Sequence, residues 1–182
     1  MPGLEEVAYD GFVEKVKRLG LEPLLNEARG ILRDFELRVL EKKDANGGAA
    51  LREIIDARFH AALGWTKIQT GGIDWTKCHR ANGTEVCLGI EIQVSARSDM
   101  LVIDIQHLRE ALTEGKIDAA VLVVPSDTLG SYLTDRAPCL KDAKRHMEVA
   151  RATDLPFVLF GLAHDGPGEA LPKRYRRTTP RR

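Results

Sequence analysis

Residues 73–94 read IDWTKCHRANGTEVCLGIEIQV. Asn82-Gly83 in the middle of this stretch is the strongest short-range signal for a two-residue β-hairpin turn, because a type I′ turn needs positive φ at both central residues. With that turn, the numbers of every opposed pair add up to 165. Asp74 then faces Glu91, and directly opposed residues have Cβ atoms roughly 4.5–5.5 Å apart. The turn therefore brings together two acids that are distant in the sequence.

Alternation along the second strand of this hairpin separates its two faces. Glu91 and Gln93 lie on one face with Asp74, and opposed like charges destabilise a hairpin unless something neutralises them. A divalent cation between the acids would do so. The alternative is a solvated face on which two acids meet by chance, and the position of Gln93 beside Glu91 favours a site. The opposite face is apolar and is expected to comprise Val86, Leu88, Ile90, Ile92 and Val94, joined by Ile73 and Trp75.

Length and composition are those of a single domain. A chain of 182 residues can bury a sizeable core, and it has neither a run of eighteen apolar residues nor a signal-peptide pattern, so we expect a cytoplasmic protein without a membrane contact. Three cysteines argue against a disulfide framework. Cys78 and Cys87 are expected to face each other as reduced, packed side chains. A zinc site that uses both with His79 lacks the usual ligand spacing.

The net charge of zero conceals a strongly basic end. Six cations and no acid occur in the last ten residues, so that residues 1–172 carry 21 basic and 27 acidic residues. This end is either an arm that binds phosphates or a solubilising tail. The cations are Lys173, Arg174, Arg176, Arg177, Arg181 and Arg182.

Apolar periodicity predicts the remaining elements. Helices are expected over residues 5–43 (two helices), 49–63, 98–114 and 140–150, and strands over residues 65–69, 118–124 and 157–162. A strand, a helix and a strand in succession imply a crossover and a parallel pair. The fold class is therefore α/β, with a mixed sheet that begins with the antiparallel hairpin, continues through crossover strands and is flanked by helices. We expect one domain over residues 1–172, with a helical part (1–63), a sheet core (64–165) and a basic tail (173–182).

Asp74 followed by Glu91-Ile92-Gln93 resembles the PD-(D/E)xK nuclease signature, in the variant of the BglII and BstYI restriction endonucleases that carries glutamine in place of lysine. The order of elements over about residues 45–165 is similar as well. Two departures are a longer hairpin and the expected lack of the extra strands with which BglII wraps DNA. The resemblance implies a restriction-endonuclease-like sheet.

The resemblance also implies a function. It indicates a type II restriction endonuclease, a homodimer that hydrolyses duplex DNA at a short palindrome containing GATC. Asp74, Glu91 and the carbonyl of Ile92 would hold Mg²⁺, for which Mn²⁺ can substitute. Gln93 cannot act as a base, so its expected role is to orient the attacking water. Glu53 and Asp56 precede the hairpin and are candidates for a further metal-site acid, although exposed carboxylates are the simpler interpretation.

Residues beside this site are candidates for DNA contact. Alternatives to restriction are a catalytically silent DNA-binding protein of the same fold and a related nuclease with a repair role. Cleavage of glycosides fits less well, because only 5% of the chain is aromatic. Where BglII has Ser-Asn after its catalytic strand, this chain has Ser95-Ala96, without an asparagine to read adenine. The DNA-binding candidates are Ser95 and Arg97, Ser131 and Arg136 in the polar loop 126–138, and Lys173, Arg174, Arg176 and Arg177.

Overall fold

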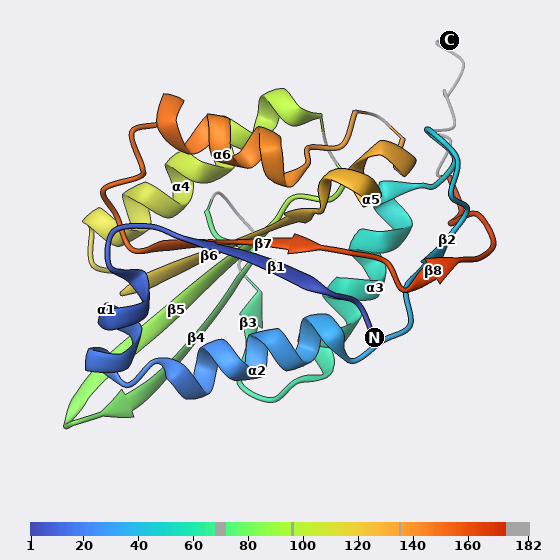
Figure 1. Cartoon of the computed structure of the whole chain (residues 1–182). Coiled ribbons are helices and arrows are strands. Elements are labelled where there is room, and N and C mark those ends of the chain that lie inside the picture. Colours follow the sequence, from blue (N-terminus) through green and yellow to red (C-terminus); the bar gives the residue numbers. More distant parts are fainter. Residues whose placement is uncertain (68–71, 96, 135, 174–182) are drawn as a thin grey trace, which may run out of the picture.

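A mixed β-sheet forms the centre of the molecule in the computed structural model, which describes residues 1–67, 72–95, 97–134 and 136–173 (Figure 1). In these ranges the large sheet has the strand order β1-β7-β6-β5-β4-β3. Its strands are β1 (Leu4–Ala8), β3 (Thr66–Lys67), β4 (Trp75–Ala81), β5 (Thr84–Ile92), β6 (Ala119–Pro125) and β7 (Phe157–Leu162). A small sheet pairs β2 (Arg38–Val39) with β8 (Gly166–Pro167).

Helices cover both faces of the sheet, which confirms the predicted α/β class (Figure 1). One core lies between the sheet and α1, α2 and α3, and contains Leu51 and Phe59. The other lies against α4 and α6, and contains Ile105 and Met147. The helices are α1 (Phe12–Leu19), α2 (Glu22–Arg33), α3 (Gly48–Ala61), η1 (Ser98–Met100), α4 (Leu101–Thr113), α5 (Asp127–Tyr132) and α6 (Leu140–Val149).

Parallel strands occupy the middle of the sheet. β6 pairs in parallel with both β5 and β7, as the strand-helix-strand order predicts. All seven residues of β6 are buried, because helices cover both of its faces. On one side of these parallel strands, β4 pairs antiparallel with β5. On the other side, β1 pairs antiparallel with β7. The hairpin thus continues directly into a fully buried parallel core, which holds its β5 strand in place.

The hairpin has the predicted register. β4 and β5 pair from Ala81 with Thr84 to Trp75 with Ile90, so every pair of the ladder adds up to 165. Asn82 and Gly83 have φ values of 52° and 82°, as a type I′ turn requires. The turn and the alternation of side chains agree, and together they fix which residues of β5 face the α4 side.

The two helices predicted within residues 5–43 are present as α1 and α2, but they cover less of this region than expected. Residues 4–8 form β1, an edge strand on β7, and α2 ends at Arg33, so that Leu40 follows β2 instead of lying in a helix. Leu4 and Val7 point to opposite faces of this strand, because Leu4 packs against one core and Val7 against the other. The left-handed backbone at Asp10 and Gly11 separates β1 from α1. The polar loop 126–138 likewise contains a short helix, α5, capped by Ser126.

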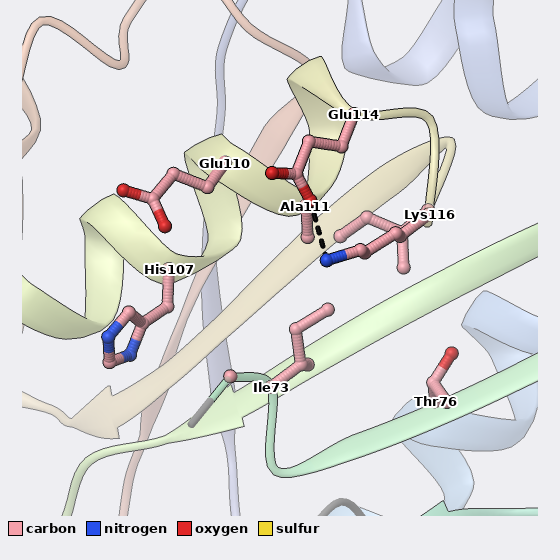
Figure 2. A pocket seen from close by; sticks show the side chains of 9 residues that line it. Ile73, Thr76, His107, Glu110, Ala111, Glu114 and Lys116 are labelled. Carbon is pink, nitrogen blue, oxygen red and sulfur yellow. Dashed lines mark ion pairs between the residues drawn. The ribbon is translucent and has the colours of Figure 1, made fainter. Parts of the chain in front are cut away.

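Ile73 lies on the opposite side of the sheet from the predicted one. It packs in the α4 core, while Trp75 packs in the α3 core. Figure 2 shows Ile73 pointing from the chain before β4 toward α4. A Cβ on Gly89 would lie 3.1 Å from Ile73 Cδ1 and 2.7 Å from Ile117 Cδ1, so the bare backbone of Gly89 makes room for both side chains. Alternation fails at Ile73 because the ladder has already ended.

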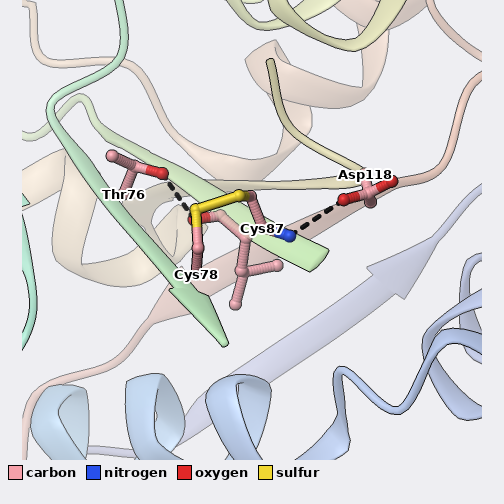
Figure 3. Close-up of a disulfide and its surroundings, with 5 residues drawn as sticks. Thr76, Cys78, Cys87 and Asp118 are labelled. Atoms are coloured by element: carbon pink, nitrogen blue, oxygen red, sulfur yellow. Dashed lines mark hydrogen bonds between the residues drawn. A yellow bond between two sulfur atoms is a disulfide. The ribbon is translucent and has the colours of Figure 1, made fainter. Parts of the chain in front are cut away.

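Cys78 and Cys87 face each other as predicted, but they form a disulfide instead of remaining reduced (Figure 3). The Cys87 amide donates to Asp118 Oδ2 at 2.8 Å, away from β4. The cysteines therefore occupy a non-hydrogen-bonded pair, where opposed backbones approach most closely, and their Cα atoms are 4.0 Å apart. Cys139 is a free thiol.

None of the helices in the described ranges combines the length and the apolar character that crossing a bilayer requires.

Replacing Gly83 by Ala is expected to lower the free energy of unfolding by about 1 kcal/mol, because L residues are disfavoured at positive φ. Gly83 has φ +82°, and among the described atoms none lies within 4 Å of a Cβ placed there, so the cost comes from the backbone. Gly30 is the matched control, since it is exposed in α2 with equally open surroundings. Gly30→Ala should raise the free energy of unfolding by about 0.5–1 kcal/mol. Urea unfolding measures both, and effects of the same sign would contradict the turn assignment.

Candidate active site

The site forms where the ladder between β4 and β5 ends. Trp75 and Ile90 are its last pair, so the backbone of Ile92 has no partner in β4. The carboxylate of Asp74 takes that place and accepts from the Ile92 amide at 2.8 Å. The Asp74 amide in turn donates to Glu91 Oε2 at 3.0 Å. The two acids thus lie together as the register predicts. Two hydrogen bonds between side chains and backbone amides hold them there, and not a regular ladder pair.

Arg52 extends from α3 to the end of the β4–β5 ladder, where Asp74 and Ile92 lie. Its terminal nitrogens contact Asp74 Oδ1 and the carbonyl oxygen of Ile92. Burial opposes the charge of Arg52, but the carboxylates of Asp74 and Asp56 outweigh it, and the pKa of the guanidinium is raised. Arg52 could not be recognised from the sequence, because only the packing of α3 shows that it faces the hairpin.

Asp104 on α4 is a third acid of the site. The side chain of Gln93 donates from Nε2 to Asp104 Oδ2 at 2.5 Å. Burial raises the pKa of Asp104 to about 6, and the charge of Asp74 contributes to the rise. Glu91 is only 8% exposed, and burial first, then the charges of Asp74 and Asp104, raises its pKa well above the usual range of a carboxyl. The site therefore gathers more carboxyl groups than its protein surroundings can readily keep charged.

Asp56, one of the two candidates for a further acid, has other partners. It accepts from Trp75 Nε1 at 3.0 Å and pairs with Lys67 at 2.6 Å, while Arg52 Nε is 3.1 Å away. Glu53 lies on the same helix. Within the residues that the structure describes, no three His, Cys, Asp or Glu side chains are grouped as a metal site.

Two small or buried residues fix α3 against the end of β5. A Cβ on Gly48 would lie 2.3 Å from the carbonyl oxygen of Val94, so only glycine allows the helix to start this close. The buried Asn46 side chain bonds to the backbone of Leu40, Tyr132 and Leu171, and thereby joins three segments at the start of α3. From the sequence, residues 44–48 are predicted only as the gap between the helices expected over 5–43 and 49–63. The packing makes them the support of Arg52.

The predicted DNA-contact residues occupy two neighbouring places. Arg97 and Arg136 are exposed, and the Ser98 amide donates to the Arg136 carbonyl oxygen at 3.2 Å, so the end of the β5 segment adjoins the loop 126–138. Arg97 also pairs with Asp99 at 2.9 Å. Ser95, which is half-buried, precedes this contact in the chain.

The second place lies around Asp44. Its amide donates to the Ser131 carbonyl oxygen at 3.3 Å, and Lys173 Nζ donates to the Asp44 carbonyl oxygen at 2.7 Å. The hydroxyl of Ser131 donates to Thr128 within α5. The base of the basic tail therefore lies next to the loop proposed to read DNA. Arg174, Arg176 and Arg177 lie outside the described residues.

A cavity of about 350 Å³ lies between Ile73, which precedes Asp74 of the site, and the C-terminal part of α4 (Figure 2). His107 and Glu110 line it from α4, and Glu114, which follows this helix, pairs with Lys116 at 2.5 Å. His107 lies close enough to Asp104 for its charge to oppose part of the rise in the pKa of Asp104. The cavity lies on the α4 side of the sheet, away from Arg52.

A mixed sheet in which an antiparallel hairpin carrying acids joins parallel strands, with helices on both faces, is the core of the restriction-endonuclease-like α/β proteins. The model of the family "Restriction endonuclease BglII/BglIII" matches residues 21–162, and the chain belongs to that family of type II restriction endonucleases. It is therefore a deoxyribonuclease, a hydrolase that binds and cleaves DNA. No curated protein matches the sequence.

The Asp104→Asn variant is expected to be more stable than the wild type at pH 8 in EDTA, by about 1–2 kcal/mol after allowance for screening by solvent. Folding raises the pKa of Asp104 from 3.8 to about 6. Its protonated form therefore stabilises the fold below pH 4, and this contribution is lost as the pH rises through 6. Asparagine keeps an acceptor for Gln93 without the charge.

Urea unfolding at pH 4 and pH 8 tests the role of Asp104, with the exposed Asp154→Asn as the matched control. The advantage of Asp104→Asn should shrink toward pH 4. An identical pH dependence in wild type and Asp104→Asn would show that Asp104 is not held in an unfavourable charged state.

Proposed function

We propose that this protein is a Mg²⁺-dependent type II restriction endonuclease whose metal is held by Asp74, Glu91 and the carbonyl oxygen of Ile92. One observation carries the proposal. An oxygen of Asp74 and the carbonyl oxygen of Ile92 converge on a single cationic group, the guanidinium of Arg52. The two oxygens contact the two terminal nitrogens of one guanidinium, and we propose that a metal ion can draw both onto itself. The buried Glu91 adds a second carboxylate beside them.

The donor set suits magnesium. Mg²⁺ prefers oxygen ligands, takes few of them from protein and keeps several waters, and Mn²⁺ accepts the same ligands. The Ile92 carbonyl is available because the ladder ends before it, whereas a carbonyl in the middle of a strand is bonded to its neighbour. When bound, the ion would lower the pKa of a water and neutralise charge on the scissile phosphate.

Gln93 and Asp104 have complementary roles in this proposal. Gln93 Nε2 donates to Asp104, and this bond decides which way the amide points. The amide oxygen of Gln93 is left as an acceptor that can orient the attacking water, although it cannot take up the proton as a base. Asp104 is then a positioning residue that acts through Gln93.

DNA recognition would use the residues that border the site. Ser95, Arg97, Ser131 and Arg136 are proposed to contact bases and nearby phosphates, since two loops that follow strands of the sheet bring them to the same region. We further propose a homodimer that cuts a palindrome, because the two-fold symmetry of a dimer matches that of a palindrome. The resemblance to BglII is what suggests that this palindrome contains GATC. Action on cellular DNA would place the protein in the cytoplasm.

Asp74→Asn and Glu91→Gln should each reduce cleavage of plasmid DNA at least about 1000-fold, the loss expected when one member of a cooperating catalytic set is removed. Both variants should still bind DNA in a gel-shift assay, and the wild type should be inactive in excess EDTA. Glu85→Gln is the matched control, because Glu85 is exposed on the same strand and should tolerate the change. Full activity in Asp74→Asn, in Glu91→Gln or in EDTA would rule out the proposed metal site.

Removal of residues 174–182 tests whether the basic tail binds phosphates. The truncation deletes five arginines and retains Lys173 with its contact to Asp44. Binding to DNA of any sequence should weaken, and the dependence of log K on log salt should flatten by up to about 0.9 for each phosphate that the protein no longer binds. Fluorescence anisotropy at several salt concentrations measures the slope. Changing the five arginines to lysine is the control that keeps the charge, and an unchanged slope in the truncated protein would mean that the tail is merely solvated.

A further inference from the structure

Arg52 occupies the place where the proposed metal ligands meet. Its terminal nitrogens contact Asp74 Oδ1 and the Ile92 carbonyl oxygen, which are two of the three proposed donors. Its side chain is 20% exposed and that of Asp74 is 17% exposed, so the contact is largely shielded from water. A guanidinium stays protonated at any physiological pH. It cannot make room for a second cation by losing its charge.

We propose that Arg52 is an internal cation that holds the metal position in the metal-free protein and has to leave it before a divalent ion can bind. This inference rests on the function proposed above. Two cations a few ångströms apart repel each other strongly where water is scarce. Binding of the ion and the present position of Arg52 therefore exclude each other, and the metal affinity includes the cost of displacing the arginine.

The side chain, and not the helix, must move. Gly48 packs against the Val94 carbonyl and Asn46 ties the start of α3 to three other segments, so the helix backbone is fixed. Asp56 lies one turn after Arg52, with its Oδ2 3.1 Å from Arg52 Nε. This carboxylate can keep Arg52 while the terminal nitrogens turn away from Asp74.

Once released from Asp74, the terminal nitrogens of Arg52 are free to bind a DNA phosphate. Gln93 supplies no positive charge, so an arginine beside the site would provide what a lysine at that position normally provides. A phosphate that binds Arg52 also draws the guanidinium away from the metal position, so that Arg52 no longer competes with the ion. DNA and the divalent ion should consequently strengthen each other's binding.

Calorimetric titration of the full chain with Mn²⁺, without DNA, tests the proposal. The Arg52→Met variant should bind Mn²⁺ at least about 10-fold more tightly than the wild type, a typical size for coupling between two ligands. Arg52→Lys should lie between the two, because one ammonium cannot contact both oxygens as a guanidinium does. The matched control is Arg58→Met on the same helix, whose exposed side chain pairs with Asp34 at 3.7 Å and should leave Mn²⁺ affinity unchanged.

Loss of Arg52 also removes the counter-charge of Asp74, so a melting experiment provides a second readout. Added Mn²⁺ should raise the melting temperature of Arg52→Met by more than that of the wild type, even if the variant is weakly folded without metal. Equal or weaker Mn²⁺ binding by Arg52→Met, with an equal or smaller rise in melting temperature, would overturn the role of Arg52 alone. If neither protein binds Mn²⁺, or if Asp74→Asn binds it as well as the wild type, the proposed metal site itself fails and this inference falls with it.

Discussion

The early end of the β4–β5 ladder is the constraint from which the site follows. Buried backbone N–H and C=O groups must find partners, and those of Ile92 lose theirs when β4 ends at Trp75. Asp74 accepts from the amide and Arg52 donates to the carbonyl, and the two side chains also pair with each other. A requirement of sheet geometry is thus met by an ion pair. The same arrangement leaves a carbonyl oxygen that is bound to a side chain instead of a strand.

The structure places this ion pair in an electrostatically unfavourable setting. Glu91 and Asp104 are both drawn away from water and held near Asp74, and both have raised pKa values for that reason. A stable fold without function would gain by replacing such acids with apolar side chains. The acids Glu91 and Asp104 lower the stability of the fold, and binding of a cation is a function that would account for this loss. Arg52 relieves part of the repulsion for Asp74 and, together with His107, part of that for Asp104.

Local signals predicted the hairpin and its register, because a type I′ turn and alternation depend only on neighbouring residues. The same signals predicted the buried β6 and β7 from continuous apolar runs. Arg52 and Asp104 could not be found in this way, since each reaches the site from a helix whose placement depends on tertiary packing. Ile73 does not follow the alternation of side chains, because it lies beyond the end of the ladder and the bare backbone of Gly89 leaves space for it on the other face. β1 was not predicted, because a strand of five residues is too short to show a clear period.

Asn46 connects the loop proposed to contact DNA with the start of the helix that carries Arg52. The loop that carries Ser131 and Arg136 and the helix that carries Arg52 are fastened to the same buried amide, through Tyr132 on one side and the start of α3 on the other. Close-packed interiors transmit strain instead of absorbing it. If the loop contacts DNA as proposed, a duplex that displaces it also strains the anchor of α3. With the roles proposed for these residues, a misfit at the bases would reach Arg52 through this shared anchor.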